Sequence, residues 1–284
     1  MPALLDALSA PAPVVLAPTG MVPTRELTPH VPLTPAEVAA DVAACWDAGI
    51  TSVHLHARDE DGAPTWRRDV YERLVGAVRE RTPDVLINVS TSGRTWSELE
   101  RRADVLALDG DLKPDIASLT PSSLNFLTSA SVNPPDVVRG LARLMRERGI
   151  VPEFEIFDLG MISMMKRLAT EGLVDEPLLV NLFFGNLAGL QPTALEFGVA
   201  VERLPEGALW SGAGLGDYQG AAQLLSIASG GGVRTGLEDS IHPHGTRERL
   251  ATNLELVEQV HTMLAAAGRQ VMTPAQWRER LAAA

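Results

Sequence analysis

The strongest constraint on the fold of this chain is an alternation of short apolar, β-branched runs with longer segments of helical periodicity. Short apolar runs are typical of buried strands, whereas apolar residues that recur every three or four positions indicate amphipathic helices. Eight strands are predicted, at Val14–Pro18, Thr51–Ala57, Asp84–Thr91, Asp115–Thr120, Val151–Phe157, Leu178–Phe184, Leu209–Gly214 and Val233–Asp239. Helices are predicted at Pro35–Ala48, Arg67–Arg81, Ser97–Ala103, Pro134–Arg148, Ile162–Glu171, Thr193–Val201, Gly220–Ser229 and Arg247–Ala267.

Eight such pairs predict an α/β fold, the (β/α)8 TIM barrel, which typically needs about 250 residues. Helix starts carry the expected signals: Thr34-Pro35-Ala36-Glu37 combines a threonine cap, a first-turn proline and a glutamate three residues after the cap. A doubly wound open sheet would show the same alternation. No break in composition divides the chain, so we expect one barrel domain over residues 1–284, with a short N-terminal arm and a C-terminal helical extension.

Two histidines in the second strand give the clearest chemical signal. His54 and His56 are two residues apart, and alternate side chains of a strand project from the same face. Both imidazoles could therefore bind one metal ion. A lone strand histidine is more often a satisfied core or surface residue, but this spacing, followed by Arg58 and Asp59, favours a metal site.

The third ligand is predicted to be a carboxylate. No histidine lies between residues 57 and 241, so a binuclear site with histidines from the middle strands cannot form. Glu238 is the natural candidate, because barrel closure leaves only the first strand between the second and the eighth. Two histidines and one glutamate leave a position open for water or substrate, as in catalytic zinc sites. His242 and His244 compete for this role, although Pro243 between them indicates an irregular loop.

Polar residues also gather at the predicted carboxyl ends of the strands, where barrel enzymes place their functional side chains. This placement favours the barrel over the open sheet. Besides the two histidines, these residues are Ser90, Thr91, Ser118, Thr120, Glu155, Asp158, Glu238 and Asp239.

Composition excludes several other functions. The net charge of −12 and the scattered basic residues argue against nucleic-acid binding. A single cysteine, Cys45, rules out an internal disulfide and a thiol-rich zinc site, and it suggests a reducing cytoplasm.

Residues 1–13 do not read as a secretory signal, and no apolar run is long enough for a membrane span. Gly212-Ala213-Gly214-Leu215-Gly216 lacks dinucleotide-binding spacing, and neither lysine is placed for Schiff-base chemistry.

Together these motifs resemble the β-keto acid cleavage enzymes, the family that includes the 3-keto-5-aminohexanoate cleavage enzyme. The resemblance runs from the first strand to the C-terminal helix. Its motifs are Leu16-Ala17-Pro18-Thr19-Gly20, His54-Leu55-His56-Ala57-Arg58-Asp59, Ser90-Thr91-Ser92-Gly93-Arg94, Ala117-Ser118-Leu119-Thr120, Pro152-Glu153-Phe154-Glu155-Ile156-Phe157-Asp158 and Val233-Arg234-Thr235-Gly236-Leu237-Glu238-Asp239.

The resemblance implies a zinc-containing barrel that condenses a β-keto acid with acetyl-CoA and releases acetoacetate and a new acyl-CoA. It also implies a homo-oligomer, with a tetramer favoured. Its zinc ligands match His54, His56 and Glu238, although histidine and carboxylate ligands would accept other divalent metals. Arg234 and Asp239 match the pair that assists proton abstraction. The predicted substrate contacts are Ser90, Ser118, Thr120, Glu155 and Arg94, with the choice among Ser118, Thr120, Glu153 and Glu155 left open.

One departure bears on the substrate. The aminohexanoate enzyme has an acidic residue soon after the Thr-Gly of its first strand, which helps to hold the substrate amine, whereas this chain reads Thr19-Gly20-Met21-Val22-Pro23. We therefore expect the distal group of the substrate to be neutral, apolar or anionic. Arg25, Arg58 and Arg94 are its possible contacts, and Glu155 keeps an amine or hydroxyl open.

Three alternatives remain from the sequence. A mononuclear hydrolase of the amidohydrolase type also uses a His-x-His strand pair, but on the first strand and with later histidines. An aldol-type lyase resembling hydroxymethylglutaryl-CoA lyase would use a similar metal and enolate without added acetyl-CoA. A binding protein without catalytic activity would not need Arg234 and Asp239 beside a complete ligand set.

Overall fold

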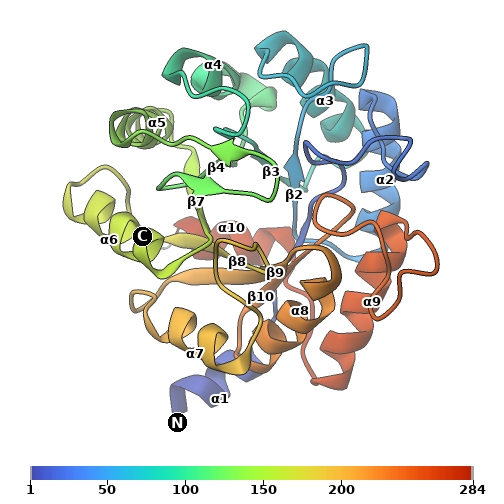
Figure 1. Cartoon of the computed structure of the whole chain (residues 1–284), viewed down its shortest axis with the longest axis vertical. Helices are drawn as coiled ribbons and strands as arrows, with labels where there is room; N and C mark the ends of the chain where they lie inside the picture. The colour runs from blue at the N-terminus through green and yellow to red at the C-terminus, as the bar shows by residue number, and fades with distance from the viewer. Residues whose placement is uncertain (1, 283–284) are drawn as a thin grey trace.

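A closed eight-stranded parallel barrel forms the centre of the computed structural model, which describes residues 2–282. Each barrel strand pairs with its neighbours in chain order, and the last strand pairs with the first (Figure 1). The barrel strands are β1 (Val14–Leu16), β2 (Ser52–Leu55), β3 (Leu86–Val89), β4 (Ile116–Leu119), β7 (Val151–Ile156), β8 (Leu179–Phe184), β9 (Leu209–Gly214) and β10 (Gly232–Thr235). The predicted TIM barrel is confirmed, and the open sheet is excluded.

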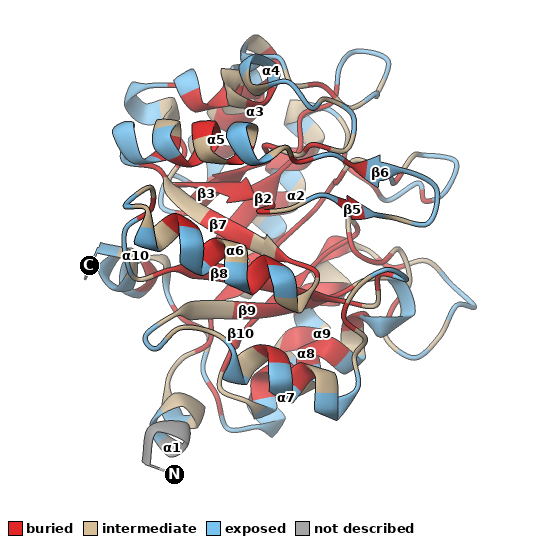
Figure 2. Cartoon of the chain, turned by 60° about the vertical axis from the view of Figure 1, so that its left-hand side comes forward, coloured by how far each residue is buried: buried red, intermediate tan, exposed pale blue. Residues whose placement is uncertain are grey.

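Helices surround the barrel and cover the outer faces of the strands (Figure 1). They are α2 (Pro35–Ala48), α3 (Arg68–Arg81), α4 (Leu99–Ala103), α5 (Pro135–Glu147), α6 (Leu159–Thr170), α7 (Ala194–Glu202), α8 (Gln219–Ala228) and α9 (Asn253–Ala266), with α1 (Pro2–Ser9) and α10 (Pro274–Ala282) near the termini. Short 3-10 turns lie at Asp104–Ala107, Gly110–Leu112 and Gly216–Tyr218. The large apolar core lies between strands and helices, where almost every strand residue is buried (Figure 2).

Several boundaries differ from the sequence predictions for local reasons. The helix expected at Ile162–Glu171 begins at Leu159, because the Asp158 side chain caps it by accepting a hydrogen bond from the Met161 amide at 2.9 Å. Asp158 is therefore a helix cap. The eighth strand ends at Thr235, so Glu238 and Asp239 lie in the loop that follows it. A small hairpin, β5 (Leu124–Asn125) and β6 (Ala130–Ser131), was not predicted.

Helix α10 closes the amino-terminal end of the barrel, opposite the β5–β6 hairpin (Figure 2). Its Trp277 is 2% exposed and belongs to an apolar cluster with Leu86, Ile116 and Leu179, the first residues of three barrel strands. The catalytic face of a barrel is the other end, so this cluster serves stability rather than chemistry.

We predict that Trp277→Ala lowers the free energy of unfolding by about 3–5 kcal/mol, because it removes a large side chain from a closed apolar cluster. Urea unfolding followed by circular dichroism measures the change. Leu195→Ala is the control, since Leu195 is 77% exposed on α7 and its truncation should change the free energy by less than about 0.5 kcal/mol. An equal effect of the two substitutions would contradict the role of α10 as a barrel plug.

Candidate active site

The two histidines of the second strand meet at the carboxyl-terminal end of the barrel. His54 is the third residue of β2, and His56 follows the strand directly. Their Nε2 atoms lie 3.1 Å apart, and the two residues are 0% and 8% exposed. Burial lowers the pKa of His54 to about 3, so its imidazole is neutral, the form that binds metal. The expected common face of the two imidazoles is confirmed.

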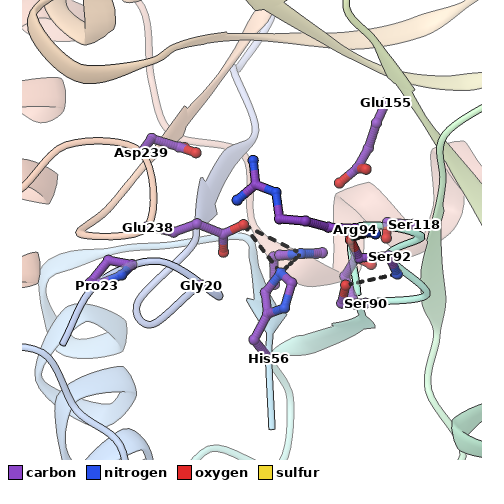
Figure 3. A network of polar contacts seen from close by, with 12 residues as sticks. Gly20, Pro23, His56, Ser90, Ser92, Arg94, Ser118, Glu155, Glu238 and Asp239 are labelled. Carbon is purple, nitrogen blue, oxygen red and sulfur yellow. Dashed lines mark hydrogen bonds and ion pairs between the residues drawn. The ribbon is translucent and has the colours of Figure 1, made fainter. Parts of the chain in front are cut away.

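Glu238 completes a three-donor cluster from the loop after β10. Its Oε1 atom lies 3.2 Å from His56 Nε2 and 4.0 Å from His54 Nε2 (Figure 3). The carboxylate reaches this position because Gly20 has no side chain: a Cβ there would lie 2.5 Å from Glu238 Cγ. Gly20 also has a φ of +64°, which favours glycine.

This cluster fits a divalent metal ion by the chemistry of its donors. One atom each from His54, His56 and Glu238 lies within 4.8 Å of the others. Glu238 Oε2 is buried without a hydrogen-bond partner among the described residues, so a carboxylate oxygen remains available. Burial would raise the pKa of Glu238, but the neighbouring His56 and Arg234 hold it well below its usual value. Two imidazole nitrogens beside an ionised carboxylate are a typical donor set for zinc or a similar ion.

A buried ion pair lies directly beside these donors. Arg234 on β10 binds Asp239 through two contacts, Nε to Oδ2 at 2.9 Å and Nη2 to Oδ1 at 3.1 Å, and its Nη2 is also 2.9 Å from Glu238 Oε1. Both side chains of the pair are 1% exposed. Burial, only partly offset by Arg234, raises the pKa of Asp239 to about 6. A carboxylate with such a pKa is ionised at neutral pH and better suited to accept a proton than an exposed aspartate.

A cavity of about 240 Å³ opens onto the donors and the ion pair. It lies at the end of the barrel where such enzymes bind substrate, and it is lined by Met21, Val22, His56, Ser90, Ser92, Arg94, Thr120, Leu124, Phe126, Ser131, Glu155, Phe157, Phe183, Leu215, Arg234, Glu238 and Asp239. Figure 3 shows Glu238 and Asp239 on one side of the site, with Arg94, Glu155 and the Ser90 loop facing them. A larger hollow of about 980 Å³ lies beside α10, but at the amino-terminal end of the barrel, opposite the end where such enzymes place their catalytic residues.

The predicted substrate contacts divide into two groups. Ser90, Thr120, Glu155 and Arg94 line the cavity. Thr120 Oγ1 donates to Glu155 Oε2 at 2.7 Å, which orients that carboxylate. Ser118 is not among the lining residues; its Oγ accepts a hydrogen bond from the Thr91 amide at 3.3 Å and so joins β4 to the Ser90 loop.

Aromatic side chains of the cavity were missed from the sequence. Phe126, Phe157 and Phe183 are three of the six phenylalanines of the chain. The Phe157 and Phe183 rings stack at 4.5 Å, and Phe126 meets Phe157 edge-on at 5.6 Å. Aromatic residues make up only 5% of the chain, so each of them could have been considered as a site residue. No local sequence pattern, however, showed that these three phenylalanines share one wall of the cavity.

Other sequence candidates lie elsewhere. His242 and His244 line a separate hollow near Gly216, where His242 Nδ1 lies 2.9 Å from the Arg249 carbonyl oxygen and His244 Nε2 lies 3.4 Å from Gln219 Oε1. Neither histidine belongs to the group of possible metal donors, which among the described residues consists of His54, His56 and Glu238. In the part of the chain that is described, no helix is both long and apolar enough to cross a bilayer.

A polar floor lies below the site inside the barrel. Glu153, 2% exposed on β7, accepts a hydrogen bond from Asn88 Nδ2 at 2.8 Å. Asn88 is the register partner of His54. Both Asn88 Oδ1 and His54 Nδ1 are buried without a hydrogen-bond partner among residues 2–282. Burial raises the pKa of Glu153 to about 7, so this carboxyl is partly protonated near neutral pH. The strand neighbour of His54 is thus a polar residue that is hydrogen-bonded to a buried carboxyl group.

A parallel barrel with two histidines, a glutamate and a buried Arg–Asp pair at its carboxyl-terminal mouth defines the class of TIM-barrel enzymes with a candidate metal centre. The comparisons give the particular family. The family model described as beta-keto acid cleavage enzyme matches residues 11–282, and the chain belongs to that family. The resemblance inferred from the motifs is confirmed.

Relatives with named activities cover nearly the whole chain. The 3-oxoadipate:acetyl-CoA acetyltransferase of Cupriavidus necator is 36% identical over 96% of this chain and 95% of its own length. The 3-keto-5-aminohexanoate cleavage enzyme of Fusobacterium nucleatum is 33% identical, covering 91% and 93%. Among solved structures, apo ObcA superposes with a TM-score of 0.79 at 21% identity, a likeness of fold alone; it covers 89% of this chain, which spans 65% of the ObcA chain.

We predict that Glu153→Gln raises the free energy of unfolding above that of wild type, and that this gain is larger at pH 8 than at pH 5. The raised pKa means that the folded state keeps a proton that the unfolded state loses above about pH 4.5, so stability from this group is lost as pH rises through about 7. Glutamine does not titrate, and the gain over wild type should reach about 2–3 kcal/mol at pH 8. Urea unfolding of chelator-treated protein at both pH values measures it. The exposed Glu206→Gln is the control; a Glu153→Gln effect that is the same at both pH values would contradict the prediction.

Proposed function

We propose that this protein is a metal-dependent acyltransferase that condenses a β-keto acid with acetyl-CoA and releases acetoacetate and a new acyl-CoA. The observation that carries this proposal is the juxtaposition of three metal-type donors with a buried Arg234–Asp239 pair on one small cavity. Family membership and relatives named as acetyl-CoA transferases support it. Zn²⁺ or another divalent ion would be held by His54, His56 and Glu238.

The residues of the chain supply defined parts of this chemistry. A bound divalent ion would draw electron density from the substrate carbonyl and so acidify the adjacent C–H bond. Asp239 accepts the α-proton, since its carboxylate lines the cavity and Arg234 holds it in one orientation through two hydrogen bonds. Arg234 also retains a positive charge beside the negative charge that develops during the reaction. Ser90, Thr120 and Glu155 are placed to orient the keto acid.

The bond changes balance without a redox cofactor. The α-carbon of the keto acid loses a proton to Asp239 and forms a bond to the acetyl carbonyl carbon of acetyl-CoA, whose C–S bond breaks to release CoA as a thiolate. The thiolate sulfur then bonds to the original β-carbonyl carbon, the bond between that carbon and the α-carbon breaks, and the α-carbon takes the proton back. The original acyl group leaves as the CoA thioester, and the α-carbon, the carboxylate and the acetyl group leave as acetoacetate. A homo-oligomer and a cytoplasmic location remain part of the proposal from the sequence.

Isotope-labelled acetyl-CoA tests this function. The purified protein is incubated with a panel of β-keto acids and acetyl-CoA carrying ¹³C in its acetyl group, and products are followed by NMR with metal content measured on the same sample. We expect label in the methyl and keto carbons of acetoacetate, about one divalent ion per chain, and loss of turnover after chelation. Cleavage without acetyl-CoA would favour a lyase of the hydroxymethylglutaryl-CoA type, and hydrolysis alone would favour the hydrolase alternative.

We predict that Asp239→Asn lowers kcat by about 10²–10⁴-fold, because an amide cannot accept the α-proton. Asparagine has nearly the same shape as aspartate, and the metal content should stay near that of wild type because Asp239 is not one of the three donors. Asp175→Asn is the matched control, because Asp175 pairs with Arg146 on the exposed surface away from the cavity. Loss of metal together with activity, or an equal effect of both substitutions, would contradict a role for Asp239 as the base.

A further inference from the structure

The chemistry of the distal end of the substrate can be inferred from the arginine of the cavity whose guanidinium has no hydrogen-bond or ion-pair partner in the described part of the chain. We propose that this site selects β-keto acids that carry a second carboxylate, and that Arg94 binds this carboxylate with the buried Arg102 behind it. The inference rests on the proposed function, because it concerns the substrate of the same site.

Two of the three arginines considered from the sequence are already engaged. Arg25 forms an ion pair with both carboxylate oxygens of Glu37, at 2.5 and 2.6 Å, and it does not line the cavity. Arg58 is 4% exposed and donates to the carbonyl oxygens of Gly20, Pro23 and Gly62 at 2.7–3.0 Å. Neither guanidinium is available to a substrate.

Arg94 differs from both. Its side chain lines the cavity, and its guanidinium carbon lies 3.6 Å from the centre of the Phe126 ring. Among the described residues no carboxylate lies within ion-pair distance of this guanidinium, and none of its side-chain nitrogens donates a hydrogen bond. Stacking on an aromatic face orients a guanidinium while leaving its N–H edge free to bind a planar carboxylate.

The loop that carries Arg94 is held in place. A Cβ at Gly93 would lie 2.6 Å from the Val132 carbonyl oxygen and 2.9 Å from Arg102 Nη1, so the loop packs closely on the hairpin that carries Phe126. The Val132 amide also donates to the Gly93 carbonyl at 3.1 Å. Arg94 is therefore preorganised, which lowers the entropic cost of binding an anion.

A second guanidinium adds positive charge behind this loop. Arg102 on α4 is 2% exposed, and only its Nε has a partner, the Thr91 carbonyl oxygen at 2.8 Å. Its Nη1 and Nη2 are buried without a hydrogen-bond partner in the described chain. Burial lowers the pKa of Arg102 to about 10, which still leaves it charged at neutral pH. A buried cation without a carboxylate contact favours an anion nearby.

Glu155 is the rival feature, because a carboxylate could instead hold an amine. Its Oε2 already accepts the hydrogen bond from Thr120, and the charges of Arg94, Arg102 and Arg234 all act on it. Glu238 also acts on Arg94, but it belongs to the donor cluster and already contacts Arg234. An ammonium group would add a further cation beside Glu155, whereas a carboxylate would meet the unused N–H groups of Arg94.

The size of the cavity and the name of one relative both agree with a short diacid as substrate. The cavity of about 240 Å³ is below the ~300–1,000 Å³ of sites for drug-sized ligands, and Phe126, Phe157 and Leu124 provide an apolar wall for a few methylene groups. The relative from Cupriavidus necator is named for 3-oxoadipate, a β-keto diacid.

Three substrates of matched size test the proposal in the metal-loaded protein. They are 3-oxoadipate, its analogue with an isopropyl group in place of the terminal carboxylate, and 5-amino-3-oxohexanoate. For wild type we expect kcat/KM to be highest with the diacid. Arg94→Met should reduce the ratio of diacid to isopropyl kcat/KM by about 30-fold, as for loss of one charge-assisted hydrogen-bonded pair. Arg94→Lys should retain part of the ratio, and Arg25→Met is the control that leaves it unchanged.

The outcomes separate this proposal from the proposed function. If Arg94→Met lowers kcat/KM equally for the diacid and the isopropyl analogue, Arg94 binds the β-keto carboxylate that both share. If it raises only the KM for acetyl-CoA, Arg94 binds CoA. Either result overturns the inference and leaves the proposed function intact. A wild-type preference for the amino acid substrate also overturns it. If no substrate reacts, the proposed function fails. Calorimetric binding of adipate and hexanoate still decides the inference, which requires that adipate bind more tightly and that Arg94→Met remove the difference.

Discussion

The buried contact between Arg234 and the carboxylates of Glu238 and Asp239 organises the active end of this barrel. One guanidinium, projecting from the last strand, holds both acidic side chains of the following loop at 2.9–3.1 Å. Removal of one partner from such a buried pair typically costs about 3–5 kcal/mol, because the other charge is left without compensation. The loop can form only because Gly236, at a φ of +140°, and Gly20 give it room. The candidate metal donor Glu238 and the candidate base Asp239 are thus positioned by the same cation.

The interior of the barrel is adapted to this centre at some cost in stability. TIM barrels usually fill this space with layers of branched apolar residues. Here Asn88 on β3, Glu153 on β7 and Asn181 on β8 are buried, and both polar atoms of the Asn181 amide lack a partner among the described residues. Buried polar groups that are only partly satisfied destabilise the fold, so their presence is best explained by what they do for the site above. Asn88 lies beside His54 on the neighbouring strand, and the charge of Arg234 acts on Glu153, so an apolar layer would give these two side chains different surroundings.

The sequence predicted those parts of the molecule that depend on period and on chain order. Strand alternation placed His54 and His56 on one face, and barrel closure brought Glu238 to them across 180 residues of chain. Boundaries were less well predicted, because they depend on single contacts such as the Asp158 cap. The β5–β6 hairpin could not be predicted: its strands are two residues each, too short for a period to be recognised.

Distant contacts are also the reason why the sequence could not choose among Arg25, Arg58 and Arg94. Each lies in a polar loop after a strand, and the difference between them is made by distant partners: a carboxylate on α2, a set of loop carbonyls, and an aromatic ring on the hairpin. Only the ring leaves the N–H groups of its arginine unused. Specificity in such a barrel therefore depends on the polar groups that the fold leaves unsatisfied.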